Sequence, residues 1–168
     1  MTEPEAVPPP HRPDRTTDSP FFHVCVVVAD LEKATDRMSE TLGLHWGDVV
    51  ESDVHFETPS GPTPTQVRFR YSLEGPPFLE VLERQDGTPW SEVGLHHLGL
   101  WGNGSRDTSA WLASGGCPRE TVLMTPDGDW VGGLFHILDD GLRIEIVEDE
   151  VKPRLARYLG GGPFIDQQ

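Results

Sequence analysis

The chain has 168 residues, which suits one compact domain or two small fused modules, and its 36% of apolar residues is low but sufficient for a core. The formal net charge is -15 and the 13 lysines and arginines are scattered, which argues against nonspecific binding to nucleic acids or anionic membranes. The sequence offers neither the roughly 20 consecutive apolar residues that cross a bilayer nor a signal-peptide core. Two cysteines without CxxC spacing fit a reducing compartment, so we expect a cytoplasmic protein.

The N-terminal region, residues 1–19, is rich in proline, charged and hydroxyl residues. Six of the 16 prolines fall within the first 20 positions, among few apolar residues. Such a composition cannot bury enough apolar surface to offset the entropy lost when a chain becomes ordered. We therefore expect residues 1–19 to form a disordered tail.

The first module, residues 20–83, begins with a β-branched run at 22–28 that has the character of a buried strand. Asp30 follows as a helix N-cap, and Gly43 stands where a left-handed glycine ends a helix. Between them, apolar residues at helical spacing predict one buried helix face, formed by Leu31, Ala34, Met38 and Leu42. Shorter apolar segments complete a βαβββ order and are expected at 46–50, 54–56, 67–71 and 77–82.

The second module, residues 95–150, repeats this order after a connection at 84–94. A strand at 97–101 is followed by a helix at 105–114 and then by strands at 121–124, 133–138 and 142–147. From the strand histidine to the glycine that ends the helix there are 20 residues in the first module (43 − 23) and 19 in the second (116 − 97). Residues 151–168 form a C-terminal tail without a functional signal, which either caps the fold or lies loose.

Each module carries a histidine at the start of its first strand and a glutamate within its last strand. His23 and Glu80 form this pair in the first module, and His97 and Glu145 form it in the second. Taken singly, such residues are usually structural or solvent-facing. Because the pattern repeats, and because imidazole and carboxylate are ligands of divalent metals of intermediate softness, it predicts a single metal centre.

The chain resembles the vicinal oxygen chelate superfamily, which includes glyoxalase I and methylmalonyl-CoA epimerase. The resemblance covers about residues 21–150 and is carried by the segments 23–34, 77–83, 94–99 and 141–147. It implies an α+β fold in which two βαβββ modules form a partly open mixed-sheet barrel around one divalent metal ion (Ni, Co, Zn, Mn, Mg or Fe). The implied metal ligands are His23, Glu80, His97 and Glu145. The second histidine of the family's Gly-x-His-His run is usually the ligand, and strand alternation is expected to turn His96 to the opposite face.

Strand alternation also predicts which side chains line the pocket beside these ligands. The substrate-pocket residues expected from alternation are Trp101, Arg143 and Phe78. His136 is added because it lies in a strand-like run just before the strand of Glu145. Arg143 either steadies an anionic group or pairs with a neighbouring carboxylate, and the pairing is favoured. Other candidates are expected at the surface or at the rim of the pocket, namely His45, His55 and Glu57.

The predicted function is that of a metal-dependent lyase, isomerase or epimerase acting on a small oxygenated carbonyl substrate. A metal that acts as a Lewis acid stabilises the enolate of such a substrate, and the glyoxalase-like resemblance implies that a ligand glutamate, Glu80 or Glu145, serves as the catalytic base. One alternative is a non-haem iron dioxygenase, which uses two histidines and one carboxylate. Another is a metal-free binding or resistance protein that sequesters a small molecule.

The resemblance leaves the substrate open. Methylmalonyl-CoA epimerase typically has glutamine at the position of Glu80, whereas glyoxalase I has glutamate there but binds glutathione through residues that this chain does not show. The two modules are able to pair within one chain or between two chains, and we expect a homodimer. The expected partner is a small-molecule substrate, without nucleic acid or membrane.

Overall fold

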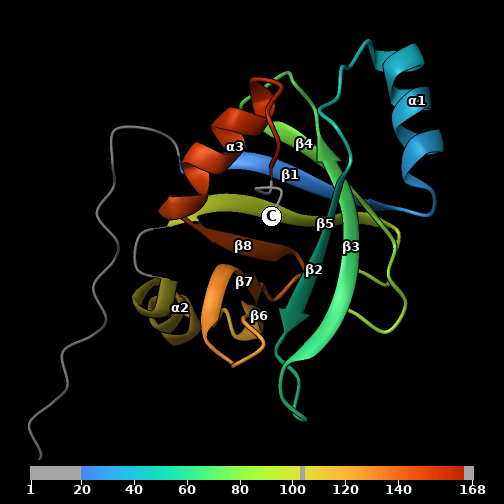
Figure 1. Cartoon of the computed structure of the whole chain (residues 1–168). Coiled ribbons are helices and arrows are strands. Elements are labelled where there is room, and N and C mark those ends of the chain that lie inside the picture. Colours follow the sequence, from blue (N-terminus) through green and yellow to red (C-terminus); the bar gives the residue numbers. More distant parts are fainter. Residues whose placement is uncertain (1–19, 103–104, 165–168) are drawn as a thin grey trace, which may run out of the picture.

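The computed structural model describes residues 20–102 and 105–164, so the predicted tail at 1–19 lies outside the described residues (Figure 1). Each half contains a strand, a helix and three further strands, and a short C-terminal helical segment follows. In chain order the elements are β1 (Phe21–Val28), α1 (Leu31–Leu42), β2 (Val50–Phe56), β3 (Thr63–Tyr71), β4 (Phe78–Glu83), β5 (Gly94–Gly102), α2 (Ser105–Ser114), β6 (Arg119–Met124), β7 (Trp130–Ile137), β8 (Arg143–Glu148), η1 (Asp149–Val151) and α3 (Lys152–Leu159).

The eight strands form one closed barrel in the order β1-β4-β3-β2-β6-β7-β8-β5. Within the modules β1 is parallel to β4 and β5 is parallel to β8, while β1 and β5 join the two modules in antiparallel orientation. The second junction, between β2 and β6, has only two residue pairs, against seven between β2 and β3. The predicted α+β barrel of two βαβββ modules is confirmed, and the modules of one chain face each other.

The ends of α1 follow the capping signals of the sequence. The carboxylate of Asp30 accepts a hydrogen bond from the backbone N–H of Lys33 at 2.9 Å, and Gly43 adopts the left-handed conformation with φ 71°. Leu31 is fully buried at the start of the helix. Leu42 departs from the predicted buried face, since it is 65% exposed as the last residue of the helix.

The segment predicted as a strand at 46–50 is wrong except for its last residue. Trp46 makes only an isolated bridge with Ser72, and β2 begins at Val50 and includes the segment predicted separately at 54–56. The reason is the indole ring, whose N–H donates to the Ser39 hydroxyl at 2.9 Å and to the Thr35 carbonyl. This contact ties the segment to α1 instead of to the sheet.

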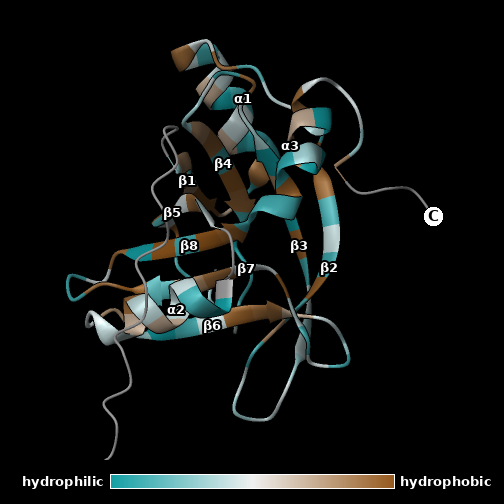
Figure 2. Cartoon of the chain, turned by 90° about the vertical axis from the view of Figure 1, so that its left-hand side faces the viewer, coloured by the Kyte–Doolittle hydropathy of each residue, from teal (hydrophilic) through white to brown (hydrophobic). Residues whose placement is uncertain are grey.

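Three apolar clusters hold the layers together. The largest fills the barrel interior, a second packs α1 against the outer face of the first module, and a third packs α2 against the outer face of the second. Figure 2 shows the corresponding brown segments along the strands, whereas the helices carry teal, white and brown residues. None of the helices in the described ranges is long and apolar enough to cross a membrane.

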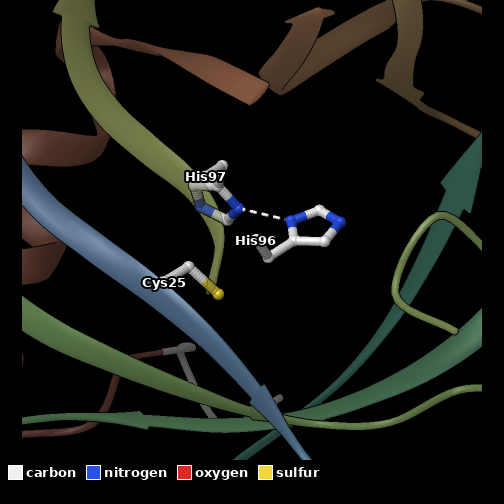
Figure 3. A group of neighbouring side chains, drawn as sticks. All are labelled: Cys25, His96 and His97. Atoms are coloured by element: carbon white, nitrogen blue, oxygen red, sulfur yellow. Dashed lines mark hydrogen bonds between the residues drawn. The ribbon is translucent and has the colours of Figure 1, made fainter. Parts of the chain in front are cut away.

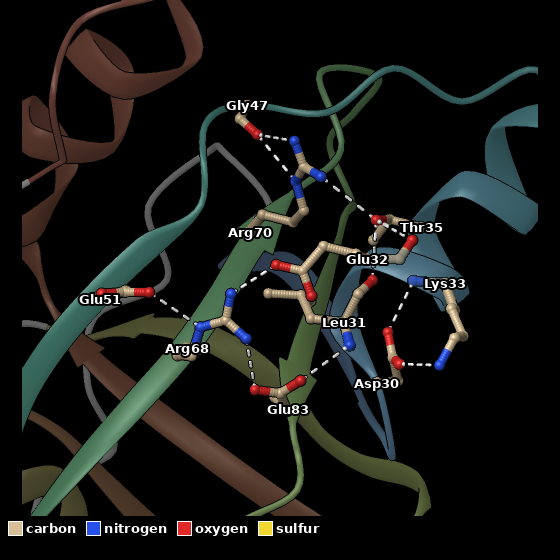
Figure 4. A network of polar contacts seen from close by, with 10 residues as sticks. All are labelled: Asp30, Leu31, Glu32, Lys33, Thr35, Gly47, Glu51, Arg68, Arg70 and Glu83. Carbon is tan, nitrogen blue, oxygen red and sulfur yellow. Dashed lines mark hydrogen bonds and ion pairs between the residues drawn. The ribbon is translucent and has the colours of Figure 1, made fainter.

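An ion-pair network fastens α1 to the sheet (Figure 4). The guanidinium of Arg68, on β3, donates to three carboxylates: that of Glu32 on α1, that of Glu51 on β2 at 3.0 Å, and that of Glu83 on β4 at 2.7 Å. The carboxylate of Glu83 also accepts from the backbone N–H of Leu31 at 3.2 Å. Arg68 on β3 thus links α1, β2 and β4 to its own strand.

The C-terminal segment caps the barrel interior as far as it is described, and residues 165–168 lie outside the described residues. Leu155 and Tyr158 of α3 are buried in the interior cluster, and the ring of Phe164 lies 5.5 Å from that of Phe69 and 6.4 Å from that of Tyr71. The Tyr158 hydroxyl donates to the carbonyl of Asp48 at 2.6 Å. The connection between modules is packed as well, since Trp90 is 3% exposed within the same cluster.

Candidate metal centre

Four side chains converge inside the barrel, each from a different strand. They are His23 on β1, Glu80 on β4, His97 on β5 and Glu145 on β8. These strands are neighbours in the order β4-β1-β5-β8 around the barrel. One nitrogen or oxygen atom from each side chain lies within 4.8 Å of those from the other three. The repeat in the sequence therefore corresponds to one cluster in space.

The separations within the cluster suit a single divalent ion. The Nε2 atoms of His23 and His97 are 2.9 Å apart. Oε2 of Glu80 lies 3.3 and 3.4 Å from these two nitrogens, and Oε2 of Glu145 lies 3.3 and 3.2 Å from them. An ion bound at roughly 2.0–2.2 Å by nitrogen and oxygen ligands holds adjacent ligands about 3.0–3.4 Å apart. The residues present therefore fit a divalent metal in both type and spacing.

Burial and charge shift the pKa values of the four groups. Burial lowers the pKa of His23, but hydrogen bonds and charge from Glu145 and Glu80 outweigh burial and raise it to about 9. The same opposing effects, with the charge of Glu145 leading, raise the pKa of His97. Burial raises the pKa of Glu145, yet the charge of His97 and hydrogen bonds from both histidines lower it to about 2, and the pKa of Glu80 is also lowered. Attraction between the imidazole and carboxylate groups thus stabilises the cluster, and a divalent cation at this place would compete with the protons.

Two glycines, each on a strand next to that of the ligand it faces, make room for the cluster. Gly99 is the register partner of His23, and a Cβ atom at Gly99 would overlap the imidazole ring. A Cβ atom at Gly133, on β7, would overlap the carboxylate of Glu145. Both contacts would be far shorter than the 3.0 Å that real Cβ atoms respect. The absence of these two side chains is therefore a condition for the observed positions of His23 and Glu145.

Gly99→Ala is expected to displace His23 and to weaken binding of Zn²⁺ by about 100-fold, the equivalent of losing one ligand. Overpacking of the interior should also lower the free energy of unfolding by about 1–3 kcal/mol. Zinc titration against a chelating dye and thermal unfolding measure the two effects. Gly115→Ala is the matched control, because its Cβ would meet its nearest neighbour at 3.4 Å. Equal zinc affinities for Gly99→Ala and Gly115→Ala would contradict this role of Gly99.

Each strand that carries a histidine of the cluster has a β-bulge at the preceding residue. The pairing of β1 with β5 shifts register between Phe21 and His23, and again where Cys25 and Val26 face His97 and Leu95. A bulge adds one residue and interrupts the alternation of side chains. The expectation that His96 faces away from the interior is therefore wrong. His96 is 3% exposed and lies against His97.

His96 makes two hydrogen-bonding contacts. Its Nε2 lies 2.9 Å from the Pro89 carbonyl oxygen, and its Nδ1 lies 2.8 Å from Nδ1 of His97. Burial, followed by the charge of His97, lowers the pKa of His96 to about 4. No pattern in the sequence indicates these contacts, because they depend on the bulge and on the path of the connection between modules.

Cys25, His96 and His97 form a second group of ligand-type atoms within 4.8 Å of one another (Figure 3). Cys25 is fully buried, and burial followed by the charges of Glu80 and Glu145 raises the pKa of its thiol well above the usual range. The thiolate, not the thiol, is the metal ligand. The group that contains both carboxylates is therefore the better candidate for a divalent metal.

Three of the predicted pocket residues differ in their surroundings. Trp101 packs against the interior cluster and stacks on Phe22 with ring centroids 3.6 Å apart, and Phe78 packs against the same cluster. Arg143 donates two hydrogen bonds to the carboxylate of Glu120, at 2.6 and 2.7 Å. The favoured pairing of Arg143 with a carboxylate is the arrangement observed.

The fourth predicted pocket residue, His136, lies elsewhere. On β7 it is Phe135 that pairs with Glu145 and joins the barrel interior, so His136 points to the opposite face, toward α2. There its Nδ1–H donates to the Cys117 carbonyl at 2.6 Å, and its Nε2 accepts from the Ser109 hydroxyl at 2.9 Å. Placing His136 in the pocket is therefore wrong, and this buried histidine fastens α2 to the sheet.

The remaining candidates lie outside the cluster, as expected. His45 is exposed and its Nδ1 lies 2.8 Å from the carboxylate of Glu74. Glu57 accepts two hydrogen bonds from Arg119 at 3.1 Å. His55, half-buried on β2, pairs with Met124 at the short junction between the modules.

The comparisons with known proteins were made against a family model, curated proteins and solved structures. The model of the "Glyoxalase/Bleomycin resistance protein/Dioxygenase superfamily" matches residues 22–128, which is more than half of the chain. The matched range contains His23, Glu80 and His97 and ends before Glu145. No curated protein matches this chain.

Several solved structures are similar to this chain at low sequence identity. A hypothetical protein, BH1468 from Bacillus halodurans C-125, has a TM-score of 0.50 and 15% identity, covering 77% of this chain and 93% of its own. A methylmalonyl-CoA epimerase in complex with methylmalonyl-CoA has a TM-score of 0.49 and 16% identity, covering 77% and 94%. The methylmalonyl-CoA epimerase from Mycobacterium tuberculosis has a TM-score of 0.47 and 19% identity, covering 80% of this chain and 92% of its own. On the evidence of the family match, the chain belongs to the glyoxalase/bleomycin resistance/dioxygenase superfamily, also called the vicinal oxygen chelate superfamily.

Proposed function

We propose that this protein is a divalent-metal-dependent lyase, isomerase or epimerase that removes a proton from a small oxygenated carbonyl substrate. The observation that carries the proposal is the convergence in the barrel interior of two imidazole nitrogens, 2.9 Å apart, and two carboxylate oxygens, each 3.2–3.4 Å from both nitrogens. The proposed ligands are His23, Glu80, His97 and Glu145. Imidazole and carboxylate together suit Zn, Fe, Ni, Co or Mn, and the donor set alone does not choose among them.

A bound divalent ion would act as a Lewis acid toward substrate oxygens and so lower the pKa of a C–H bond next to a carbonyl. The chain's own residues then have to hold the substrate and to move the proton. Glu80 or Glu145 takes the proton as general base and returns it to carbon or to a leaving group. Glu145 has the more accessible side chain, at 12% against 8% for Glu80.

The surroundings keep water away from this proton transfer. The ring of Tyr71 meets that of His23 edge-on at 5.6 Å, and Phe22 lies on another side at 4.3 Å. Tyr158 and Phe164 of the C-terminal segment cover Tyr71 in turn. An apolar, water-poor site strengthens the electrostatic attraction between a cation and an enolate-like oxygen.

A non-haem iron dioxygenase is the second candidate. Its site uses two histidines and one carboxylate and leaves three positions for oxygen and substrate. Here both carboxylates stand within 3.4 Å of a histidine nitrogen, so the fourth potential ligand favours enolisation over oxygen chemistry. A metal-free binding or resistance protein would not need this ligand set, and its completeness counts against that function.

Proton exchange in deuterated water tests the proposal with the metal-loaded protein. Pyruvate, acetoin and methylmalonyl-CoA serve as probes that each carry an acidic C–H bond. We expect the NMR signal of that proton to disappear for at least one probe, without oxygen uptake, and Glu145→Gln or Glu80→Gln to abolish the exchange. Oxygen uptake by the iron-loaded protein with catechol, and no exchange for any probe, would favour the dioxygenase instead.

The oligomeric state and the location in the cell belong to the proposal too. We propose a cytoplasmic homodimer, which a molecular mass in solution equal to one chain would contradict. The four proposed ligands come from one chain, so the cluster does not require the partner.

A further inference from the structure

The two modules differ at one position next to the cluster. In the first module the bulge residue before the ligand histidine is Phe22, whose ring meets His23 at 4.3 Å. In the second module it is His96, whose ring meets His97 at 5.1 Å. The same backbone irregularity thus presents an apolar ring to one histidine and a hydrogen-bonding ring to the other.

The neighbours of His96 determine which of its ring nitrogens donates and which accepts. The Pro89 carbonyl oxygen can only accept, so Nε2 of His96 carries a proton and donates it at 2.9 Å. A neutral imidazole has one N–H, so with Nε2 as the donor to the carbonyl, Nδ1 of His96 accepts. The proton between the two Nδ1 atoms, 2.8 Å apart, belongs to His97 (Figure 3). This leaves Nε2 of His97 to face the other three members of the cluster.

His23 has no such support. Its Nδ1 is buried and finds no hydrogen-bond partner within the described part of the chain. Nothing on that side of the ring therefore fixes which nitrogen carries the proton. Ligand histidines in metal sites almost always donate their second N–H to an acceptor, which sets both tautomer and ring orientation. Only the histidine of the second module meets this condition by contact with another side chain.

We infer that His96 is a positioning residue, which holds the Nδ1–H of His97 so that Nε2 is ready to bind the metal. This inference rests on the proposed function only in naming the metal. The acceptor is an imidazole backed by the carbonyl of the connection between modules, so the path of that connection through Pro89 sets the tautomer of a ligand on β5. The second module is the preorganised half of the centre, and His23 adjusts when the metal binds.

The direct test is NMR of the full chain labelled with ¹⁵N in histidine, both metal-free and loaded with Zn²⁺. We expect a coupling through the hydrogen bond between the two Nδ1 atoms, with the shared proton on Nδ1 of His97. In His96→Phe, which copies the residue of the first module, this coupling and the downfield proton signal should be lost. A proton found on Nδ1 of His96 in the wild-type protein would overturn the inference.

Zinc affinity, measured by competition with a chelating dye, adds a comparison among variants. His96→Phe should bind Zn²⁺ about 10- to 100-fold more weakly. His96→Asn places an amide oxygen near the position of Nδ1 and should recover the affinity to within about threefold of wild type. Phe22→Leu is the matched control, because it removes a buried ring beside His23 without removing a hydrogen bond, and it should change the affinity less than about threefold.

The outcomes separate the inference from the proposed function. If Phe22→Leu weakens zinc binding as much as His96→Phe, or if His96→Asn recovers none of the affinity, the effect is one of packing and the inference fails. If the wild-type protein binds no zinc, the proposed function fails, whereas the NMR coupling still decides the role of His96. The NMR test on wild-type protein also holds when a variant does not fold.

Discussion

Replacement of His97 by alanine is expected to weaken the binding of Zn²⁺ or Co²⁺ by at least about 100-fold. Structural zinc sites with four ligands bind with roughly 10–16 kcal/mol, so one ligand accounts for about 3 kcal/mol. His97 lies within 3.4 Å of the potential ligand atoms of the other three members and has its Nδ1 bonded to His96. Its loss therefore removes a ligand and leaves two carboxylates with one histidine. Proton exchange with the substrate should fall to the uncatalysed rate.

The matched control for this variant is His136→Gln. His136 is also fully buried and hydrogen-bonded, but it lies between β7 and α2, away from the cluster. This control should lower the melting temperature and keep the zinc affinity within about threefold of wild type. Isothermal titration calorimetry on both variants measures the difference. Wild-type affinity in His97→Ala would remove His97 from the set of ligands.

The metal-free protein is expected to be most stable near pH 6.5 and to lose stability on both sides. The pKa of His23 is raised from 6.5 to about 9, so its contribution is fully present below pH 6.5 and is lost as the pH rises through 9. The pKa of His96 is lowered from 6.5 to about 4, so stability falls as the pH drops from 6.5 toward 4. Below pH 4.5 protonation of Glu145, whose pKa is about 2, adds a further loss.

The free energy of unfolding of the metal-free protein should fall by roughly 2–3 kcal/mol between pH 6.5 and 9, because one unit of pKa corresponds to about 1.4 kcal/mol. Urea unfolding at a series of pH values measures it. Saturation with Zn²⁺ should abolish this loss, since the metal takes the place of the proton on the histidines. Metal-free protein whose stability rises between pH 6.5 and 9 would contradict the proposed electrostatics of the cluster.

The repeat in the sequence predicted the two βαβββ modules and the four members of the cluster because both depend on local patterns, whereas the barrel was implied by the family resemblance. An apolar β-branched run around His23 and an alternating run around Glu80 each indicate a strand, and their recurrence around His97 and Glu145 indicates a second module. The parallel pairing of the first and last strand within each module, and the antiparallel pairing of the two first strands, then bring the four side chains together. The metal itself and the catalytic roles of the glutamates remain predictions.

The wrong predictions arise where the pairing between two strands, and not the alternation of side chains along one strand, decides which way a residue faces. A bulge depends on the register between two strands, so the inward position of His96 could not be predicted from its own strand. His136 was placed in the pocket because it precedes Glu145 in sequence, whereas the register pairs Phe135 with Glu145. Gly133, which makes room for Glu145, has no local signal that separates it from the adjacent Gly132.

The sequence of the C-terminal segment carries the pattern of a helix with one apolar face. Leu155, Tyr158 and Leu159 follow helical spacing, with offsets of 3 and 4 from the first, which is typical of a helix that packs on a core. The structure places Leu155 and Tyr158 in the barrel interior and Leu159 against it. What the spacing could not indicate is the target of this apolar face, the end of the barrel beside Tyr71.

Anomalous X-ray diffraction from crystals of the full chain grown with Co²⁺ tests the central claim most directly. The account predicts one strong peak per chain inside the barrel, bound by Nε2 of both ligand histidines and by carboxylate oxygens of Glu80 and Glu145 at roughly 2.0–2.3 Å. It would be contradicted by a barrel interior without a peak at saturating Co²⁺, or by a peak at Cys25 and His96 that leaves both glutamates unbound.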